Sequence, residues 1–254
     1  MALLHLRGES IAEIKAVLFD KDGTLAYSQP NLEILAHTRI FYCQQSVAAN
    51  QRKKLNKLLM SAYGIHQTQI LPTSSISVAS RHHNMISTAT VFCQIGIPWA
   101  KAVRDASAIF QATDKCYQKI NQFIDETTEL AEQYLKALHS EGVICGVISN
   151  DNEIEIWRFL KYHRLENLVQ IIWSSEDQPS KPNSEVIYHI CDILQLQPVE
   201  CMLISDADTD LYMAQKAGTG LTLGYTNGWT TNNVLYFGDY QVSNWSELEI
   251  RDQF

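Results

Sequence analysis

Two aspartates stand two residues apart directly after an apolar run near the amino terminus. The run at 16–19 is followed by Asp20, Lys21 and Asp22. Residues i and i+2 of a strand point to the same side, so Asp20 and Asp22 are expected to face one pocket while Lys21 points elsewhere. A carboxylate is already ionised at neutral pH and can attack phosphorus without an activating base. A second carboxylate beside it can transfer the proton. These residue types therefore suit phosphoryl transfer through an aspartyl phosphate.

Further polar residues stand where later apolar runs end. They are Ser149 with Asn150, Lys181, and Asp206, each set after a different run. Ligands of open α/β sheets bind beyond the carboxyl ends of the strands, so these residues are expected to converge with Asp20. Asp20 and Asp206 packed together would repel each other, and one would hold a proton unless a cation intervened. Mg²⁺ suits that place, because it prefers oxygen ligands and substrate phosphates.

The other groups of this set suit the oxygens of a phosphoryl group. Negative charge accumulates on those oxygens during transfer, and positioned donors stabilise it. The Lys181 ammonium and the Ser149 hydroxyl are expected to bind them. Backbone amides around Gly23 and Asn150 are expected to add further donors. Gly23 and Thr24 also let the chain turn sharply out of its strand.

The elements that must position these residues follow from the hydrophobic pattern. Short apolar runs are continuous rather than alternating, which is typical of strands covered on both faces of a parallel sheet. The runs cover residues 14–19, 143–148, 169–173, 201–204 and 220–224. Segments with apolar residues at helical spacing separate the later runs. One ends at Gly142, one has Asn152 and Glu155 as a cap pair, and one ends before Pro198. The predicted fold class is therefore α/β, with a doubly wound, Rossmann-like parallel sheet.

The segment between the first two runs has a different hydrophobic period. From Pro30 to about Asp125 the period is helical, and no long apolar run typical of a strand occurs. The simplest organisation is one strand, an inserted helical domain and then the rest of the sheet. We expect a core domain of residues 1–28 and 127–254 and an α-helical cap domain of residues 29–126.

Composition limits the class of protein. The 254 residues are 46% hydrophobic and 19% charged, as in ordinary globular proteins. The net charge of −8 argues against a nucleic-acid or anionic-membrane surface. No apolar stretch reaches the ~18 residues of a membrane span, and the amino-terminal segment lacks the order of a secretory signal. The six cysteines show no C-x-x-C spacing, which indicates reduced thiols and a cytoplasmic protein.

Taken together, these residues resemble the haloacid dehalogenase superfamily, specifically its phosphatase branch with a phosphoglycolate phosphatase-like helical cap. The first motif, D-x-D-G-T-L, is matched by residues 20–25. The second motif, a Ser or Thr at a strand end, is matched by Ser149, and the third, a Lys often followed by Pro, by Lys181 and Pro182. The fourth motif, an acidic pair before a helix ending in A-G, is matched within residues 205–218. The four motifs occur in order and span nearly the whole chain.

The resemblance implies a Mg²⁺-dependent phosphatase that acts on a small phosphorylated metabolite. Asp20 would be the nucleophile and Asp22 the general acid and base. The ion would be held by Asp20, by the carbonyl of Asp22 and by the side chain of Asp206, while Asp210 and Thr24 would support these ligands. The acid at position 22 favours phosphate esters, because members that remove halide or cleave phosphonates lack it. The cap would close over the site and select the substrate.

The chain departs from the family pattern at four positions. Ser205 and Ala207 flank Asp206 where Gly and Ser are usual, Tyr27 replaces a common Asp, and Ser184 replaces a common Pro. None of these changes removes a group with a catalytic role. Two alternatives share the same fold. One is a phosphomutase that returns the phosphoryl group to a sugar, and the other is a non-catalytic binding protein, which Ser205 and Ala207 leave open.

Other polar and aromatic residues have simpler interpretations. Asp208 fits a helix amino-terminal charge as well as it fits a ligand. His82 and His83 would point about 100° apart on a helix and so chelate poorly together. Packing is the interpretation for Trp157, Trp173 and Trp229. Solvated helix-face charge is the interpretation for Arg81, Arg104 and Lys115.

Overall fold

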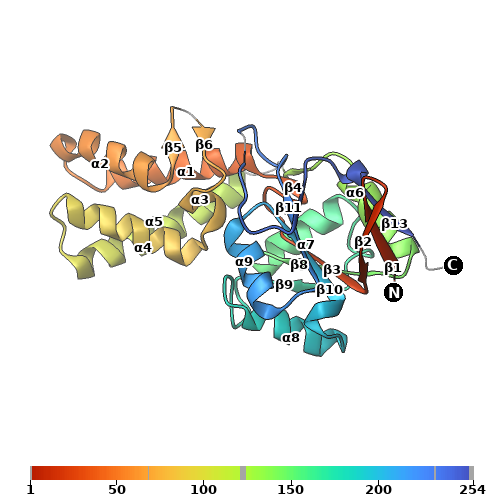
Figure 1. The fold of residues 1–254 in the computed structure, drawn as a ribbon. Coiled ribbons are helices and arrows are strands. Elements are labelled where there is room, and N and C mark those ends of the chain that lie inside the picture. The colour runs from red at the N-terminus through yellow and green to blue at the C-terminus, as the bar shows by residue number, and fades with distance from the viewer. Residues whose placement is uncertain (1, 68, 121–123, 232, 252–254) are drawn as a thin grey trace. The chain divides into compact units, whose positions relative to one another are not determined.

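The chain folds into two compact units in a computed structural model, which describes residues 2–67, 69–120, 124–231 and 233–251. One unit comprises Met1–Ser28 with Asp125–Phe254, and the other comprises Gln29–Ile124. We call them the core unit and the inserted unit (Figure 1). The chain therefore leaves the core unit after Ser28 and re-enters it at Asp125.

A six-stranded parallel sheet forms the centre of the core unit, in the order β12-β11-β10-β3-β8-β9 (Figure 1). Its strands are β3 (Ala16–Phe19), β8 (Ile144–Ile148), β9 (Ile171–Trp173), β10 (Cys201–Ser205), β11 (Leu221–Tyr225) and β12 (Tyr240–Val242). Every neighbouring pair is parallel, which confirms the predicted α/β class. All but β12 coincide with a predicted run. The sequence of β12 gave no such run because two of its three residues are exposed.

Helices cover both faces of this sheet. They are α6 (Ala131–Ser140), α7 (Glu153–Tyr162), α8 (Glu185–Leu194) and α9 (Asp208–Ala217). Leu18 of β3 shares a core cluster with Ile190 of α8 and Leu211 of α9. The next residue, Phe19, points to the other face, where its ring lies edge-on to Tyr134 of α6 at 6.3 Å between centroids. Successive side chains of β3 thus pack on opposite faces of the sheet, and both faces are covered. This explains why β3 has no exposed residue and is a continuous apolar run in the sequence.

Local sequence sets the ends of these helices. The Asn152 side chain accepts the backbone N–H of Glu155 at 2.9 Å, as the predicted cap pair requires. Gly142 and Gly218 follow α6 and α9 with φ of +68° and +75°, the left-handed values that end a helix. The chain is thereby turned back toward the sheet after each helix.

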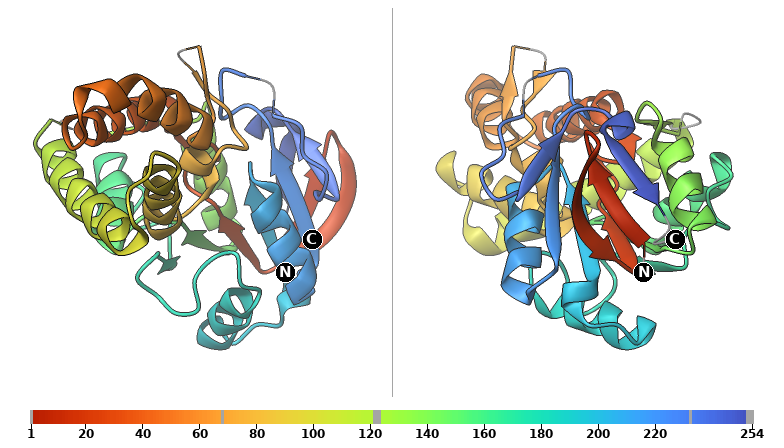
Figure 2. Two further views of the ribbon diagram at one scale, coloured as in Figure 1. Left: turned by 90° about the vertical axis from the view of Figure 1, so that its left-hand side faces the viewer. Right: turned by 45° about the vertical axis from the view of Figure 1, so that its right-hand side comes forward.

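A small antiparallel sheet that was not predicted belongs to the core unit. Strand β1 (Ala2–Leu6) pairs with both β2 (Glu9–Ile14) and β13 (Leu248–Arg251). Figure 2 shows the hairpin of β1 and β2, in red, beside the blue β13. Arg7 and Gly8 form the turn with φ of 52° and 87°, values typical of a two-residue hairpin loop. Buried and half-buried residues alternate along β1, as in a strand with one covered face, although its sequence A-L-L-H-L does not alternate apolar and polar residues.

The inserted unit is helical, as its period predicted. Its elements are α1 (Gln29–Gln45), α2 (Ala49–Ala62), β5 (Ile65–His66), β6 (Gln69–Ile70), α3 (Ser75–Val78), α4 (Arg81–Gln94) and α5 (Trp99–Ile120). Its interior includes the fully buried side chains of Leu55, Leu59, Phe92 and Phe110. Strands β5 and β6 form a two-residue ladder that the helical period did not predict.

Short elements complete the core unit. They are β4 (Ala26–Tyr27), β7 (Glu126–Thr127), the 3₁₀ turn η1 (Pro198–Glu200) and the 3₁₀ turn η2 (Trp245–Glu247). Strands β4 and β7 pair antiparallel, so the chain leaves and re-enters this unit along one ribbon. Within the described residues, no helix combines the length and apolar character needed to cross a bilayer. All six cysteines are free thiols, as their spacing predicted.

Candidate active site

The central strands bring the predicted residues to one end of the sheet. Strand β3 lies between β10 and β8, and Asp20, Asp206 and Ser149 directly follow these three strands. The backbone N–H of Asp20 continues the ladder by donating to Ile204 at 2.9 Å. Parallel strands end at the same edge of a sheet, so the three side chains become neighbours although they are far apart in sequence.

Lys181 joins this group from the loop after β9. Its ammonium donates to Asp20 Oδ1 at 2.6 Å and to Asp210 Oδ2 at 2.5 Å, and its side chain is 3% exposed. Burial alone would lower the pKa of Lys181, but the two carboxylates outweigh it and raise the pKa above its ordinary value. Ser205 donates a further hydrogen bond to Asp210 Oδ2 at 3.1 Å. Asp210 therefore contacts Lys181; its predicted support of the metal ligands stays a prediction.

Asp20 and Asp206 are buried and in contact. Burial raises the pKa of Asp20 from 3.8 to about 6, and Lys181 offsets only part of that effect. The pKa of Asp206 is raised well above its ordinary value by burial, by the charge of Asp20 and by a hydrogen bond between the two carboxyl groups. Two carboxyl groups this close disfavour their common ionised state unless a cation lies near them. Two adjacent carboxyl groups in a buried place are a donor set that fits a hard divalent ion such as Mg²⁺.

Side chains alone do not complete such a cation site. Among the described residues, no three His, Cys, Asp or Glu side chains are grouped so as to hold a metal. Asp20 and Asp206 are thus two side-chain donors that need oxygens of another kind, from backbone, water or substrate. The carbonyl of residue 22 stays a predicted ligand.

Thr24 fixes Asp206 from the turn that follows Asp20. Its hydroxyl accepts the backbone N–H of Asp206 at 3.0 Å and donates to Asp206 Oδ1 at 3.2 Å. Gly23 has φ of +73°, and a Cβ at this position would lie 2.3 Å from Asp206 Oδ2. The turn therefore requires glycine both for its backbone conformation and for the close approach of Asp206.

Asp22 lies in a different environment from the one predicted. Its Oδ1 contacts the Lys21 ammonium at 2.5 Å and accepts the hydroxyl of Ser28. The expectation that Lys21 points away from Asp22 is wrong, because β3 ends at Phe19 and strand alternation does not extend to residue 22. Burial raises the pKa of Asp22, but Lys21 and Ser28 outweigh burial and hold that pKa below its ordinary value.

Lys21 is the centre of an acidic cluster that the sequence analysis missed. Its buried ammonium lies 3.0 Å from Asp151 Oδ2 and 3.8 Å from Asp125 Oδ2, in addition to Asp22. Burial raises the pKa of Asp151 to about 6 despite Lys21. Asp151 comes two residues after Ser149, and Asp125 is the residue at which the chain re-enters the core unit. No local spacing in the sequence pairs either acid with Lys21.

The predicted phosphate-binding groups surround the same strand ends. The Ser149 side chain is buried, and its hydroxyl accepts the backbone N–H of Asp151 at 3.1 Å. Asn150 follows it in the loop that leads to α7, and it also has a partner of its own. Ser149 and Asp20 therefore follow two paired parallel strands, β8 and β3, and the phosphate-binding role of Ser149 stays a prediction.

Trp229 is a second residue of this site that sequence reasoning missed. Its indole N–H donates to Asp206 Oδ2 at 2.6 Å, and the residue is 4% exposed. The amide of Asn233 donates to the backbone carbonyl of Asp206 at 2.6 Å. Trp229 was interpreted only as a packing residue, and nothing in its local sequence indicates a partner 23 residues earlier.

The remaining candidates have structural contacts. Asp208 accepts the backbone N–H groups of Tyr236 and Phe237, so its carboxylate holds a loop. In the inserted unit, Arg81 pairs with Asp114 at 2.5 Å and Arg104 lies 3.8 Å from Asp105. The rings of His82 and His83 lie edge-on with centroids 6.1 Å apart, which does not form a chelate.

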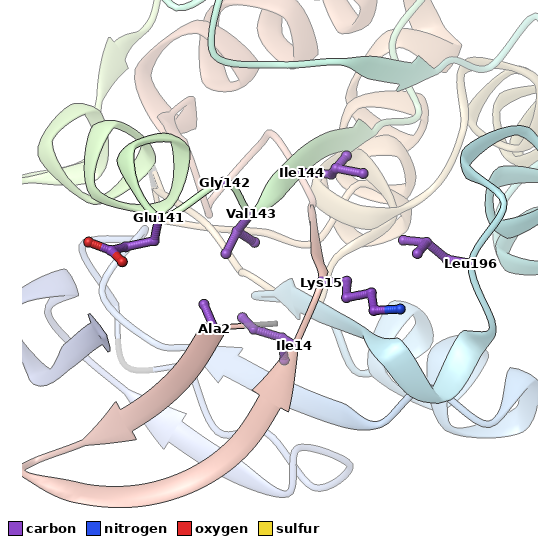
Figure 3. Close-up of a pocket in the computed structure, with 8 residues that line it drawn as sticks. All are labelled: Ala2, Ile14, Lys15, Glu141, Gly142, Val143, Ile144 and Leu196. Atoms are coloured by element: carbon purple, nitrogen blue, oxygen red, sulfur yellow. The ribbon is translucent and has the colours of Figure 1, made fainter. Parts of the chain in front are cut away.

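A cavity of about 210 Å³ lies elsewhere in the core unit (Figure 3). It is lined by Ala2, Ile14, Lys15, Glu141, Gly142, Val143, Ile144 and Leu196. Lys15 and Ile144 stand at the beginning of β3 and β8, whereas Asp20 and Ser149 follow the carboxyl ends of these strands. The cavity is therefore separate from the cluster of acids and Lys181.

Comparisons with known proteins agree with this fold. The sequence model of the haloacid dehalogenase-like hydrolases matches residues 14–218. A phosphoglycolate phosphatase of Vibrio vulnificus strain YJ016 is 24% identical over 220 residues, covering 85% of this chain and 87% of its own. A phosphoglycolate phosphatase of Salmonella typhi is 25% identical over 232 residues, covering 86% of this chain and 85% of its own.

Solved structures show the same fold. A predicted phosphoglycolate phosphatase from Haemophilus somnus superposes with a TM-score of 0.67 at 17% identity, covering 93% of this chain and 97% of its own. A magnesium-bound HAD-hydrolase of Bacillus subtilis has a TM-score of 0.61 at 16% identity, covering 93% of this chain and 97% of its own.

Proposed function

This chain belongs to the haloacid dehalogenase-like hydrolase family, and we propose that it hydrolyses the phosphate monoester of a small metabolite. The observation that carries the proposal is the buried contact of Asp20 with both Asp206 and the Lys181 ammonium. A nucleophilic carboxylate, an acidic partner for a cation and a fixed positive charge are what phosphoryl transfer through an aspartyl phosphate needs.

Asp20 is the proposed nucleophile. Its carboxylate oxygen attacks the phosphorus, the bond between phosphorus and the ester oxygen breaks, and the phosphoryl group is transferred to Asp20. Water then attacks the same phosphorus, which releases inorganic phosphate and restores the carboxylate. Lys181 remains beside Asp20 and balances negative charge on the transferring group.

Asp22 is the proposed carrier of the proton. It gives a proton to the leaving ester oxygen in the first half of the reaction and takes one from water in the second. Lys21 holds Asp22 in its ionised form, which is the form that deprotonates water. For the first half, Asp22 must take up a proton, and this weakens its pairing with Lys21.

Mg²⁺ is the proposed cofactor, and a magnesium-bound relative of the same fold supports it. Asp20, Asp206 and the carbonyl of Asp22 would hold it, with Thr24 fixing Asp206. When bound, the ion neutralises the paired carboxyl groups and the charge of the phosphate. Ser149 and the amides near Gly23 and Asn150 are the proposed donors to the remaining phosphate oxygens.

The proposed substrate class is a small phosphorylated metabolite in the cytoplasm. The curated relatives named above are phosphoglycolate phosphatases, so phosphoglycolate is the first compound to test. The inserted helical unit is the proposed cap that selects the rest of the substrate. The free thiols of all six cysteines support a reducing compartment.

The test is release of inorganic phosphate from a panel of phosphorylated metabolites, with Mg²⁺ and with chelator. We expect turnover of at least one compound by the wild-type chain, and loss of that turnover in Asp20→Asn and on chelation. Asp208→Asn is the matched control, because Asp208 is a nearby acid whose carboxylate binds loop amides. Turnover that survives in Asp20→Asn would refute the proposed nucleophile.

A further inference from the structure

Trp229 makes a polar contact that its packing role does not require. Its indole N–H donates to Asp206 Oδ2 at 2.6 Å, while Thr24 donates to the other oxygen, Oδ1, at 3.2 Å. Each oxygen of the carboxyl group thus has one neutral donor, and the two donors come from different segments of the chain. Two donors on opposite oxygens fix the plane of a carboxyl group, which a single donor leaves free to rotate.

The loop that carries Trp229 is fixed against the turn after Asp20. A Cβ on Gly228 would lie 1.7 Å from the carbonyl oxygen of Gly23, so the two backbones touch directly. A Cβ on Gly23 would lie 2.4 Å from the indole nitrogen of Trp229. Asn233 adds a hydrogen bond of 2.6 Å to the Asp206 carbonyl. The position of the indole is therefore set by backbone packing on both sides.

An indole N–H is well suited to hold a cation-binding carboxylate. It donates one hydrogen bond, carries no charge and cannot accept a proton. It therefore occupies one lone pair of Oδ2 without competing with a cation, whereas a Lys or Arg in its place would neutralise the carboxylate. Groups that hold metal ligands in this way typically change metal affinity 10–100-fold when they are removed.

We propose that Trp229 is a positioning residue for Asp206, whose carboxylate it orients for a divalent cation through the indole N–H. The proposal rests on the proposed function, in which Asp206 is a ligand of Mg²⁺. Trp229 lies beyond residues 14–218, to which the family model aligns. This contact is therefore a feature of the chain that the family match does not include.

Trp245 provides a matched control for a purely structural role. It lies in the same unit, it is 1% exposed, and its indole N–H donates to Thr128 Oγ1 at 2.9 Å. Trp245→Phe and Trp229→Phe therefore each remove one buried indole hydrogen bond and part of one ring. Only Trp229→Phe removes a donor to Asp206.

The experiment measures Mn²⁺ binding to the full-length protein by electron paramagnetic resonance, in which the signal of free Mn²⁺ falls as the ion is bound. We expect Trp229→Phe to raise the Kd for Mn²⁺ by roughly tenfold or more. Trp245→Phe should change the Kd much less. Its partner Thr128 donates to the backbone carbonyl of Thr24, and the Thr24 hydroxyl that contacts Asp206 stays in place. Asp206→Asn should remove the binding. Circular dichroism of each variant checks that it is folded.

A second measurement leaves Trp229 in place. In a chain that retains only Trp229 of its five tryptophans, Mn²⁺ or Mg²⁺ should change the indole emission, and in a chain that retains only Trp245 it should not. A folded Trp229→Phe variant with wild-type affinity, or an unchanged emission of Trp229, would overturn the proposal while leaving the proposed function intact. Unaltered binding in Asp206→Asn would refute the cation-binding role of Asp206, and the positioning role of Trp229 with it.

Discussion

Replacing Asp20 by Asn should make the cation-free protein more stable while it abolishes turnover. Burial raises the pKa of Asp20 from 3.8 to about 6, so the folded state binds this proton more tightly than the unfolded state does. The stability that Asp20 contributes is therefore present at acid pH and is lost as the pH rises from 3.8 through about 6. A shift of about 2 pKa units corresponds to about 3 kcal/mol. Asn has nearly the same size and no charge, so it avoids this loss.

The expected result is a pH-dependent difference between the two proteins in chelator. Asp20→Asn should exceed the wild-type chain in free energy of unfolding by up to about 3 kcal/mol near pH 7.5, and by almost nothing near pH 4. Urea unfolding followed by tryptophan fluorescence measures this in the core unit, because four of the five tryptophans lie there. A Trp99→Phe background removes the emission of the inserted unit.

Two results would contradict this reasoning. Asp20→Asn that is less stable than the wild-type chain at neutral pH would show that the ion pair with Lys181 outweighs the burial of Asp20. A difference that does not change between acid and neutral pH would show that the titration of Asp20 is not its cause. Asp208→Asn, tested in the same way, controls for removal of an acid that is not buried beside a second carboxyl group.

Three further substitutions test the packing around the site and in the inserted unit. Lys21→Met should lower the free energy of unfolding by about 3–5 kcal/mol at neutral pH, because it removes the ammonium that three half-buried carboxylates contact. The loss should be smaller near pH 5, and urea unfolding at both pH values would measure the difference. Gly228→Ala should cost about 1–3 kcal/mol in urea unfolding and weaken Mn²⁺ binding, because its Cβ would overlap the Gly23 carbonyl. Arg39→Met should leave the free energy of unfolding in urea unchanged or higher, because this buried arginine stacks on the Phe110 ring and lies 3.8 Å from Asp114. A loss of more than about 2 kcal/mol would contradict this.

The strand-end residues could be predicted because their placement depends on local pattern and one topological rule. Continuous apolar runs indicate buried parallel strands, and the carboxyl ends of adjacent strands meet. Asp20, Ser149 and Asp206 each follow such a run, and the structure places them on three neighbouring strands. Strands β1 and β13 escaped prediction for the opposite reason. They pair with each other across almost the full length of the chain, and β13 has no apolar run of its own.

The sequence by itself determined the α/β class, the helical insertion and the identity of the acids and the lysine at the strand ends, because these follow from side-chain type and short-range period. Tertiary structure alone decided which partner each ionisable group has. Lys21 pairs with Asp22 because the strand ends at Phe19, and Trp229 reaches Asp206 because two glycines let distant backbones touch. Such contacts depend on how turns pack against one another, and no spacing along the chain specifies that packing.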